Sequence, residues 1–483
     1  MFYILFFVIL LAAMVLFALL AKKKGTVALD LMIKITTVGF ITLSMSGFFL
    51  PDLFMCTHTD AILEKLMDAK LYAMVRWLNA VSFTVLPIAV FQKNKYFEKI
   101  ASFFCLPMAF VNVAYYGQHI EYFVADGYSG LQTVRLFSEG FKEFLVNEGF
   151  RSIFFGMTCL FQLSALILLT YKNRAKLPIF KSEIANLIAI LIGVTYISLP
   201  IYVPQYLFGH VNIMMTRFSL VHIAWIVLIV AIILVLYLAF QYKSYEAKYL
   251  LVLSMAWALM MQFSQVFVAV AEINIMKLPL QLCNLGSYLA LIMILKKSDK
   301  LFHFTLIVNV VGAIIAIAIL DIGKDSSHLT RLFVVHYIVE HTKVLVVPLL
   351  CLVLRIFKPI EARSIKHFFI GFTCYYGFVF LLGTISNGFY RMFEGEYIQN
   401  FFNANFLFMF DKETAGGLIG FAVPLFEKCV IKIGIFEIYP IIQILIYVVF
   451  MTICLLAYLL VHALTKRQRV DYANGRYLKY ENR

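Results

Sequence analysis

The sequence has few charged residues and lacks the short motifs that mark most soluble enzymes. Only 14% of its 483 residues are Asp, Glu, Lys or Arg and 63% are hydrophobic, whereas about 25% are charged in a soluble protein. It contains no CxxC pair, no HExxH or His-x-His pattern, no phosphate-binding loop and no G-x-S-x-G elbow. A soluble enzyme, a nucleic-acid-binding protein and a disordered chain are excluded. Neither a metal nor another cofactor is expected.

Long apolar segments account for the low charge. The hydrocarbon core of a bilayer is about 30 Å thick, so a spanning helix needs about 20 mainly apolar residues. Thirteen segments qualify: 2–21, 29–50, 71–91, 98–117, 152–171, 183–205, 218–240, 249–271, 278–296, 302–320, 330–356, 366–388 and 438–463. The sequence therefore predicts an all-α polytopic membrane protein with about 13 transmembrane helices.

The basic residues sort by side of the predicted membrane. The chain has 41 Lys and Arg against 27 Asp and Glu, a net charge of +14, and most of the basic residues follow alternate spans. These basic connections lie at 22–24, 93–99, 172–181, 243–248, 296–300, 355–366 and in the tail after 465. Because cytoplasmic loops carry the excess of Lys and Arg, the N-terminus is predicted outside and the C-terminus in the cytoplasm.

Two stretches of the sequence resemble each other. RWLNAVSFTVLPIAVFQKNKYFEK (76–99) aligns with QLCNLGSYLALIMILKKSDKLFHF (281–304) at an offset of 205, which places Asn79 on Asn284. A basic turn follows the apolar run at the same place in both stretches. Self-similarity of this kind indicates an internal duplication.

Two further landmarks support the duplication. The same offset places Phe97 on Phe302, and the tripeptide RLF recurs at 135–137 and 331–333, an offset of 196. Six spans per copy is an even number, so we expect two parallel six-helix repeats plus a final helix. The predicted domains are an N-terminal repeat, a seven-helix C-terminal unit and a basic cytoplasmic tail, at 1–210, 211–465 and 466–483.

The eleventh predicted span contains several ionisable residues. Such residues are costly inside a membrane and are commonly functional. His336, Glu340 and Lys343 are spaced to share one helix face, whereas His341 lies about 100° around the helix. One interpretation is a functional site. The other is a structural Glu–Lys pair accompanied by hydrogen-bonded core histidines.

A cysteine near the start of the ninth span is the candidate nucleophile. Cys283 lies in LPLQLCN (278–284), roughly 8 Å below the predicted outer edge at 1.5 Å per residue, and His341 lies roughly 16 Å deep. A thiol and an imidazole at these depths are close enough to interact if the two helices are neighbours. A nucleophilic thiol needs such a base, although a cysteine and a distant histidine also coincide by chance.

Other polar residues sit at span ends or inside spans. Gln281 and Asn284 flank Cys283, and Asn309 and Asn387 lie in the tenth and twelfth spans. The outer segment 389–437 is apolar for a loop, so we expect it to be re-entrant or to lie on the membrane surface.

Three motifs in residues 245–465 resemble the YwaF-like family of bacterial integral membrane proteins. LPLQLCN matches a Leu-Pro pair followed by a polar residue, Leu and Cys, and HTKVLVVP matches a histidine-bearing helix with a later proline. ANFLFMF matches an Asn-aromatic signature, which marks Asn405. The family has two adjacent histidines, whereas here Glu340 replaces the first and His336 stands one turn earlier.

The resemblance implies an activity. The family is similar to a eukaryotic transmembrane acyltransferase that remodels ether phospholipids, which implies Cys283 as nucleophile, His341 as base and His336 as the alternative base. Gln281, Asn284 and Asn405 would then donate hydrogen bonds to the oxyanion. The expected reaction moves an acyl chain from a phospholipid to a lipid, glycolipid or lipoprotein acceptor at the outer leaflet of a bacterial plasma membrane.

The N-terminal copy lacks the same chemistry. Leu78 stands at the position of Cys283, and Leu145 at that of His341, so this copy is expected to be non-catalytic. Arg76, near an outer span end, is a candidate for a lipid phosphate, or else its side chain simply reaches the headgroup region.

In the acyltransferase, Asn309, Glu340 and Asn387 are candidate substrate contacts. Two alternatives stay open. The chain is also compatible with a transporter or lipid flippase, in which His, Glu and Lys of the eleventh span relay protons. It is equally compatible with a membrane scaffold without chemistry. In all three cases the expected partners are membrane lipids and not nucleic acid.

Overall fold

The computed structural model describes residues 26–45, 67–115, 147–201, 203–209, 211–264, 280–320, 329–410 and 428–475, with positions 140, 143–144, 275, 278 and 424. Within these residues, nine helices are long and apolar enough to cross a membrane. The expected class, an all-α polytopic membrane protein, is confirmed. The first predicted span, 2–21, lies outside the described residues, and the total of 13 and the orientation stay predictions.

The chain forms two compact units. The N-terminal unit comprises residues 1–212, 257–271 and 328–336, and the C-terminal unit comprises 213–256, 272–327 and 337–483. The first change of unit falls close to the predicted boundary at 210. Two short segments of the second half nevertheless pack with the first unit, which a boundary drawn along the sequence does not anticipate.

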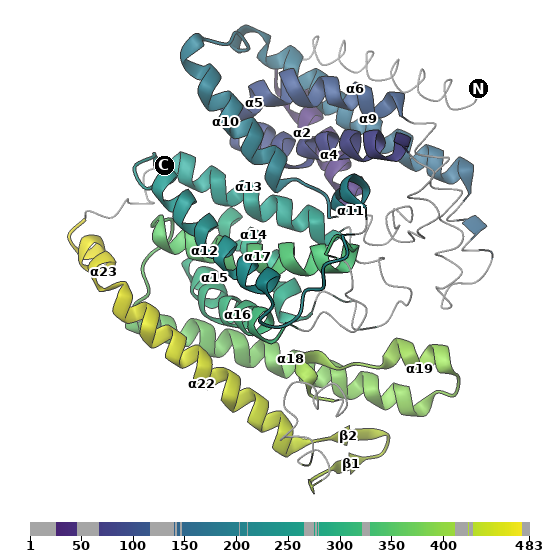
Figure 1. Ribbon diagram of the computed structural model, residues 1–483, viewed down its shortest axis with the longest axis vertical. Helices are drawn as coiled ribbons and strands as arrows, with labels where there is room; N and C mark the ends of the chain where they lie inside the picture. The colour runs from purple at the N-terminus through teal and green to yellow at the C-terminus, as the bar shows by residue number, and fades with distance from the viewer. Residues whose placement is uncertain are drawn as a thin grey trace. The chain divides into compact units, whose positions relative to one another are not determined.

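The described elements of the N-terminal unit are helices (Figure 1). They are α2 (Thr26–Met45), α4 (Met67–Pro87), the π-helix η3 (Ile88–Gln92), α5 (Lys95–Ile100), the π-helix η4 (Ala101–Cys105), α6 (Leu106–Ala114), α9 (Glu148–Asn173), η5 (Arg174–Lys176), α10 (Lys181–Ile197) and α11 (Val203–Phe208). At the crossing of α2 and α9, a Cβ on Gly39 would lie 2.8 Å from the Phe161 ring. Small residues permit such close approaches between membrane helices.

Pro87 explains why a π-helix follows α4. Proline has no backbone N–H, so the carbonyl four residues earlier loses its helical donor. That carbonyl, on Phe83, instead accepts a hydrogen bond of 2.8 Å from the indole Nε1 of Trp257. The helix widens into η3 directly after the proline.

The C-terminal unit contains the predicted site. Its elements are α12 (Leu220–Phe240), part of α13 (Tyr245–Ser264), α14 (Leu282–Leu295), α15 (Asp299–Phe304), the π-helix η7 (Thr305–Asn309), α16 (Val310–Ile319), most of α17 (Leu332–Val353), η8 (Ala362–Ser364), α18 (Ile365–Met392), α19 (Glu396–Phe402), η9 (Phe406–Phe408), β1 (Ile431–Ile433), β2 (Phe436–Ile438), α22 (Pro440–Leu464) and α23 (Lys466–Ala473). The side chains of Val346, Val347 and Leu350 of α17 are completely buried, whereas α12 exposes valines and leucines, as a lipid-facing helix does.

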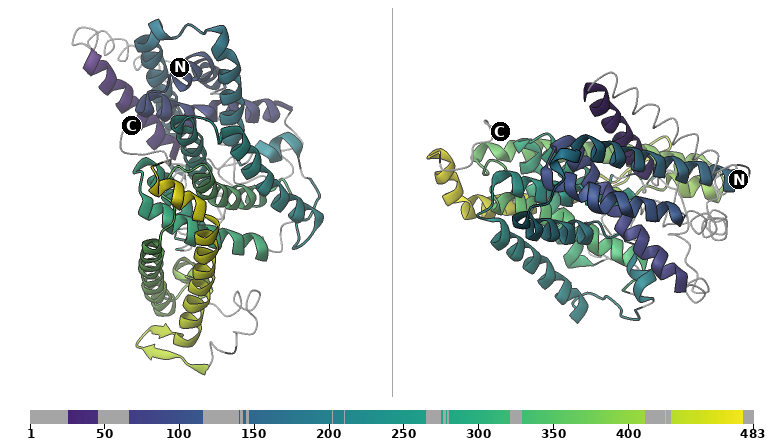
Figure 2. Two further views of the ribbon diagram at one scale, coloured as in Figure 1. Left: turned by 90° about the vertical axis from the view of Figure 1, so that its left-hand side faces the viewer. Right: turned by 90° about the horizontal axis from the view of Figure 1, so that it is seen from above.

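A short hairpin replaces part of the expected apolar outer segment. Strands β1 and β2 are antiparallel and lie at one end of the long helix α22 (Figure 2). Gly434, with φ of +60°, forms the turn. Glu437 of β2 pairs with Arg391 at 2.8 Å and Lys432 at 3.0 Å. Burial alone would raise the pKa of Glu437, but its hydrogen bonds and these cations hold that pKa below its usual range.

The same series of local features recurs in both units. Each has a left-handed lysine, a capping residue, a six-residue helix, a five-residue π-helix and then an α-helix: Lys93, Asn94, α5, η4 and α6 in one, and Lys297, Ser298, α15, η7 and α16 in the other. The offset of these features is 204, not the 205 of the sequence alignment. Phe97 therefore corresponds to Leu301 and not to Phe302.

The π-helix η3 accounts for this difference of one residue. A π-turn accommodates one more residue than the α-helical turn that it replaces. Before η3 the offset is 205, so Asn79 and Asn284 correspond. The hydrogen bonds of these two residues agree, because Asn79 Oδ1 accepts from Gln162 of α9 and Asn284 bonds to Glu340 of α17.

Candidate functional site

Two hydrogen bonds hold the start of α14, where Cys283 lies. The hydroxyl of Tyr375 in α18 donates to the Leu280 carbonyl at 2.7 Å. The Asn309 amide, at the end of η7, donates to the Leu282 carbonyl at 2.8 Å. Gln281 is the residue that precedes the helix, and its side chain makes no capping bond. The N–H groups of the first helical turn therefore lack intrahelical partners on the side of Cys283.

Asn309 reaches α14 because a glycine makes room for it. A Cβ on Gly286 would lie 2.8 Å from Asn309 Nδ2 and 3.0 Å from Val344 Cγ1. Asn309 is only 1% exposed, and its Oδ1 has no hydrogen-bond partner among the described residues. Asn309, which the sequence predicts to belong to the site, thus bonds to the carbonyl of the residue before Cys283.

A buried carboxylate lies beside Cys283. In the orientation that satisfies both groups, the Asn284 amide donates to Glu340 at 2.5 Å (Oε1) and 3.3 Å (Oε2). The same amide group lies 3.5 Å from Cys283 Sγ. The Glu340 carboxylate is thereby joined to the residue that follows Cys283 in α14. Glu340 is only 3% exposed, so α17 does bring an ionisable group to the cysteine.

His341 is buried next to Glu340 and makes a bond within α17. Its Nδ1 lies 2.7 Å from the Tyr337 carbonyl. A carbonyl only accepts, so Nδ1 carries the hydrogen, and in the neutral ring Nε2 carries the basic lone pair. The Tyr337 ring lies against the imidazole, with the two ring centres 4.1 Å apart and the rings tilted by 37°, and its hydroxyl donates to the Ala316 carbonyl at 2.6 Å. Lys343, on the same helix, is also buried. His336, the alternative base, lies in the segment that packs with the N-terminal unit.

Asn387 and Asn405 form a separate cluster around residues 403–410. The Asn387 amide donates to the Ala404 carbonyl at 2.7 Å and its Oδ1 accepts from the Ala404 N–H at 3.3 Å. Asn405 Oδ1 accepts from the Phe410 N–H at 3.0 Å. These amides shape the backbone of the Asn-aromatic motif.

Arg76, the remaining predicted residue, belongs to the N-terminal unit. Its guanidinium lies 3.4 Å from Asn112 Oδ1 and 6.0 Å from the centre of the Phe155 ring. These contacts support a packing role, and the predicted contact with a lipid phosphate stays a prediction.

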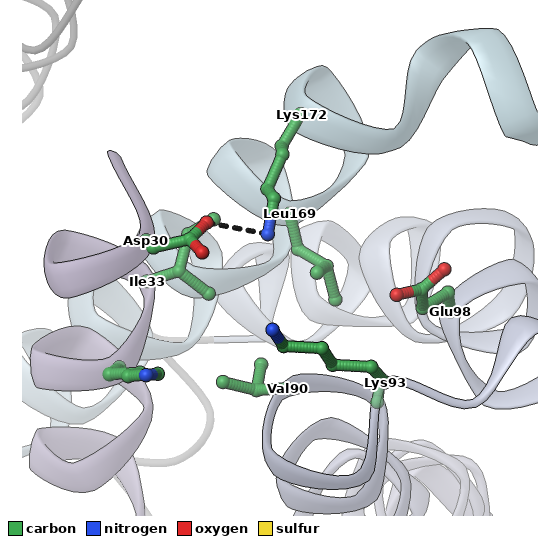
Figure 3. Close-up of a pocket in the computed structure, with 9 residues that line it drawn as sticks. Asp30, Ile33, Val90, Lys93, Glu98, Leu169 and Lys172 are labelled. Atoms are coloured by element: carbon green, nitrogen blue, oxygen red, sulfur yellow. Dashed lines mark ion pairs between the residues drawn. The ribbon is translucent and has the colours of Figure 1, made fainter. Parts of the chain in front are cut away.

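The described pocket of the N-terminal unit lies elsewhere. It is lined by five charged side chains, among them Lys172 of α9, which points at Asp30 of α2 at 2.5 Å (Figure 3). It contains none of the predicted site residues. Across the residues that the structure describes, no group of three His, Cys, Asp or Glu side chains is arranged to hold a metal ion.

Sequence reasoning missed several residues around Cys283. Tyr375 and Gly286 support the start of α14, and the Tyr337 carbonyl fixes the His341 tautomer. Each acts through a contact with another helix or with the next turn of its own helix, which the sequence alone does not show. Two in-span histidines, His303 and His367, were also missed. Both histidines are visible in the sequence, but each lies close to a basic turn and is easily assigned to the membrane surface.

Together these features define a class: a multi-pass all-α membrane protein with a buried polar cluster around a cysteine in its second half. A model of the TMEM164 family matches residues 214–461, slightly more than half of the chain. The chain therefore belongs to the TMEM164 family. No curated protein and no solved structure gives a significant match.

Proposed function

We propose that the protein is a membrane acyltransferase that carries the acyl chain as a thioester on Cys283. The supporting observation is the arrangement at the start of α14, where the thiol lies beside an amide that a buried Glu340 orients. The proposed location is the outer leaflet of a bacterial plasma membrane, which the resemblance of the motifs to the YwaF-like family supports. Membrane lipids are the acyl donors.

The proposed reaction has two steps. In the first, Cys283 Sγ attacks the ester carbonyl of a phospholipid, the S–C bond forms and the ester C–O bond breaks. The thiol proton passes to the base, which the resemblance assigns to His341 Nε2, and then to the leaving lysolipid oxygen. In the second, an acceptor hydroxyl or amine attacks the thioester, its proton passes to the base, and the thiol is restored.

The start of α14 suits the charge that develops. The tetrahedral intermediate carries a negative oxygen, which backbone N–H groups stabilise when they are already oriented. The first-turn N–H groups of α14 are free of intrahelical bonds, and Gln281 does not cap them. Gln281 and Asn284 are the flanking amides in this proposal. Asn405 keeps its predicted role only if the segment 403–410 approaches Cys283.

The thioester is the product to test. The full-length protein in lipid nanodiscs is incubated with a phospholipid that carries a labelled acyl chain, and the intact mass is measured. We expect one hydroxylamine-labile adduct in the parent and in Cys374→Ala, a matched control that removes an exposed thiol of α18. Cys283→Ala should give none, and Cys283→Ser should retain a hydroxylamine-resistant ester. An unchanged adduct in Cys283→Ala, or full activity without an adduct, would refute the proposal.

A transporter or flippase is the second candidate, because Glu340, His341 and Lys343 are all buried within one helix. In that case Glu340→Gln should abolish movement of a fluorescent lipid between leaflets, while Cys283→Ala leaves it intact. The acyltransferase predicts no such movement in either protein.

A further inference from the structure

One buried lysine of the N-terminal unit holds two helices together. Lys99 is the fifth residue of the six-residue helix α5, and its ammonium pairs with Glu183, the third residue of α10, at 2.5 Å. It also donates to the Pro178 carbonyl, in the loop before α10, at 2.8 Å. The contact is therefore an ion pair reinforced by a hydrogen bond to the backbone.

Two histidines occupy the corresponding positions in the C-terminal unit. His303 is the fifth residue of the six-residue helix α15, and His367 is the third residue of α18. Their Nδ1 atoms lie 3.1 Å apart, and His303 Nε2 lies 3.3 Å from the Lys358 carbonyl in the loop before η8. The same helices are thus joined by the same geometry, with imidazoles in place of an ion pair.

Protons decide whether this contact holds. His303 Nε2 donates to the carbonyl, so in the neutral ring its Nδ1 is bare and accepts from His367 Nδ1–H. One added proton preserves the bond, because a charged His303 donates to a bare His367 Nδ1. A second proton leaves two N–H groups facing each other without an acceptor, and two positive rings in contact.

The two histidines differ in their exposure to solvent. His303 is buried, whereas His367 is half-buried. The charged groups that face them are Asp299 and Lys300 of α15 and Lys358, whose ammonium lies 3.7 Å from the Asp299 carboxylate. One carboxylate offsets these cations, so a first added proton is tolerated better than a second.

We infer that His303 and His367 form a proton-binding site that releases α15 from α18 when both imidazoles are charged. The corresponding Lys99–Glu183 contact is an ion pair and contains no imidazole. The two released helices lead to Asn309 and Tyr375, which hold the carbonyls around Gln281. Acid therefore loosens the start of α14, and the consequence for Cys283 alone rests on the proposed function.

Hydrogen exchange of the full-length protein in nanodiscs tests this site. Exchange is followed by mass spectrometry from about pH 8 to about pH 3.5 and is corrected for the intrinsic rate. The range extends below that of a free imidazole because burial and the charge of Lys300 oppose the second proton. We expect protection of 299–304 and 365–372 to fall by up to about tenfold per pH unit. Protection of α5 and α10, the internal control, should stay constant.

Two variants decide the outcome. His303→Lys combined with His367→Glu copies the N-terminal pair and should abolish the pH-dependent loss of protection. If that protein does not fold, His367→Gln should do the same, because a double positive charge is no longer possible. Constant protection in the parent, or a loss that persists in the folded variant, would overturn the inference. The readout needs no acyl transfer, so failure of the proposed function leaves it valid.

Discussion

The two units share a framework and differ in the residues that could react. Where the N-terminal unit has Leu78 next to Asn79, the C-terminal unit has Cys283 next to Asn284. Asn79 bonds to the neutral Gln162, whereas Asn284 bonds to the carboxylate of Glu340. The asparagine hydrogen bond between two helices is common to both units, whereas the thiol and the carboxylate occur only in the C-terminal unit. Under the proposed duplication and the proposed function, the C-terminal unit would be the reactive copy.

The hydrogen bonds also change which residues of the N-terminal unit correspond to those of α17. The RLF landmark placed Leu145 opposite His341, but 135–137 and 145 lie outside the described residues. The hydrogen bonds instead align Glu340 with Gln162 of α9, and hence His341 with Leu163. Both alignments place a leucine there, so the expectation that the N-terminal copy lacks the imidazole is the same in either register.

The largest expected effect on the acylation rate comes from replacing single residues of α17 by their counterparts in α9. His341→Leu removes the proposed base and should slow acylation of Cys283 by about 100- to 10,000-fold. Glu340→Gln retains an acceptor for the Asn284 amide but removes the charge, and should slow it about tenfold. Both rates are measured as the appearance of the labelled adduct.

The order of these two effects is informative. A larger loss in Glu340→Gln than in His341→Leu would make the carboxylate the base and leave the imidazole a supporting role. Unchanged rates in both would remove α17 from the chemistry. Leu163→Met, a change of similar size in the N-terminal unit, is the matched control and should leave the rate unaffected.

The second effect concerns stability and the contrast between an ion pair and an imidazole pair. Lys99→Met leaves the Glu183 carboxylate without its buried partner and should lower the Tm on the order of 5 °C. Lys95 also pairs with Glu183 but is 61% exposed, so Lys95→Met is the control and should change the Tm little.

Replacing both partners tests the cause of that loss. Lys99→Met with Glu183→Met removes both charges and should recover most of the Tm. His303→Leu should cost less than Lys99→Met at neutral pH, since it leaves a neutral His367. If the double variant is no more stable than Lys99→Met, packing and not the unpaired charge explains the effect.

The sequence predicted the helices far better than their contacts. Long apolar runs report which segments enter the membrane, so every predicted span that lies mainly within the described residues contains a helix. The Asn79–Asn284 match was also visible, because a polar residue in an apolar run stands out. The predicted meeting of the Cys283 thiol with an imidazole of α17 stays a prediction, and the residue of α17 that the structure joins to the Cys283 region is Glu340, through Asn284.

The remaining features depend on three-dimensional packing. The change of offset follows from η3, and a π-turn has no composition of its own. Asn387 and Asn405 were predicted as substrate contacts, yet each makes a hydrogen bond to the backbone of 404–410, which no spacing reveals. The three-residue strands of the hairpin are too short for an alternating pattern to identify them.

The smallest effect should come from adding a single methyl group at a position where the two frameworks differ. At the offset of 205, Gly286 corresponds to Val81, which is completely buried in the N-terminal unit. At the offset of 204, Asn309 corresponds to Cys105, a smaller side chain. In the C-terminal unit, glycine in place of valine on α14 leaves space for the longer Asn309 side chain, whose amide reaches the Leu282 carbonyl.

Gly286→Ala tests that exchange. The new Cβ would lie 2.8 Å from Asn309 Nδ2, so the amide must move and its bond to Leu282 weakens. We expect a loss of about 1–3 kcal/mol in the free energy of unfolding and slower acylation of Cys283. Gly377→Ala, in α18, meets no atom within 4 Å and should be neutral or stabilise its helix by up to about 1 kcal/mol. Equal effects of the two changes on stability and rate would show that Asn309 needs no space from Gly286, and that the difference between the units at this position has no part in holding the cysteine.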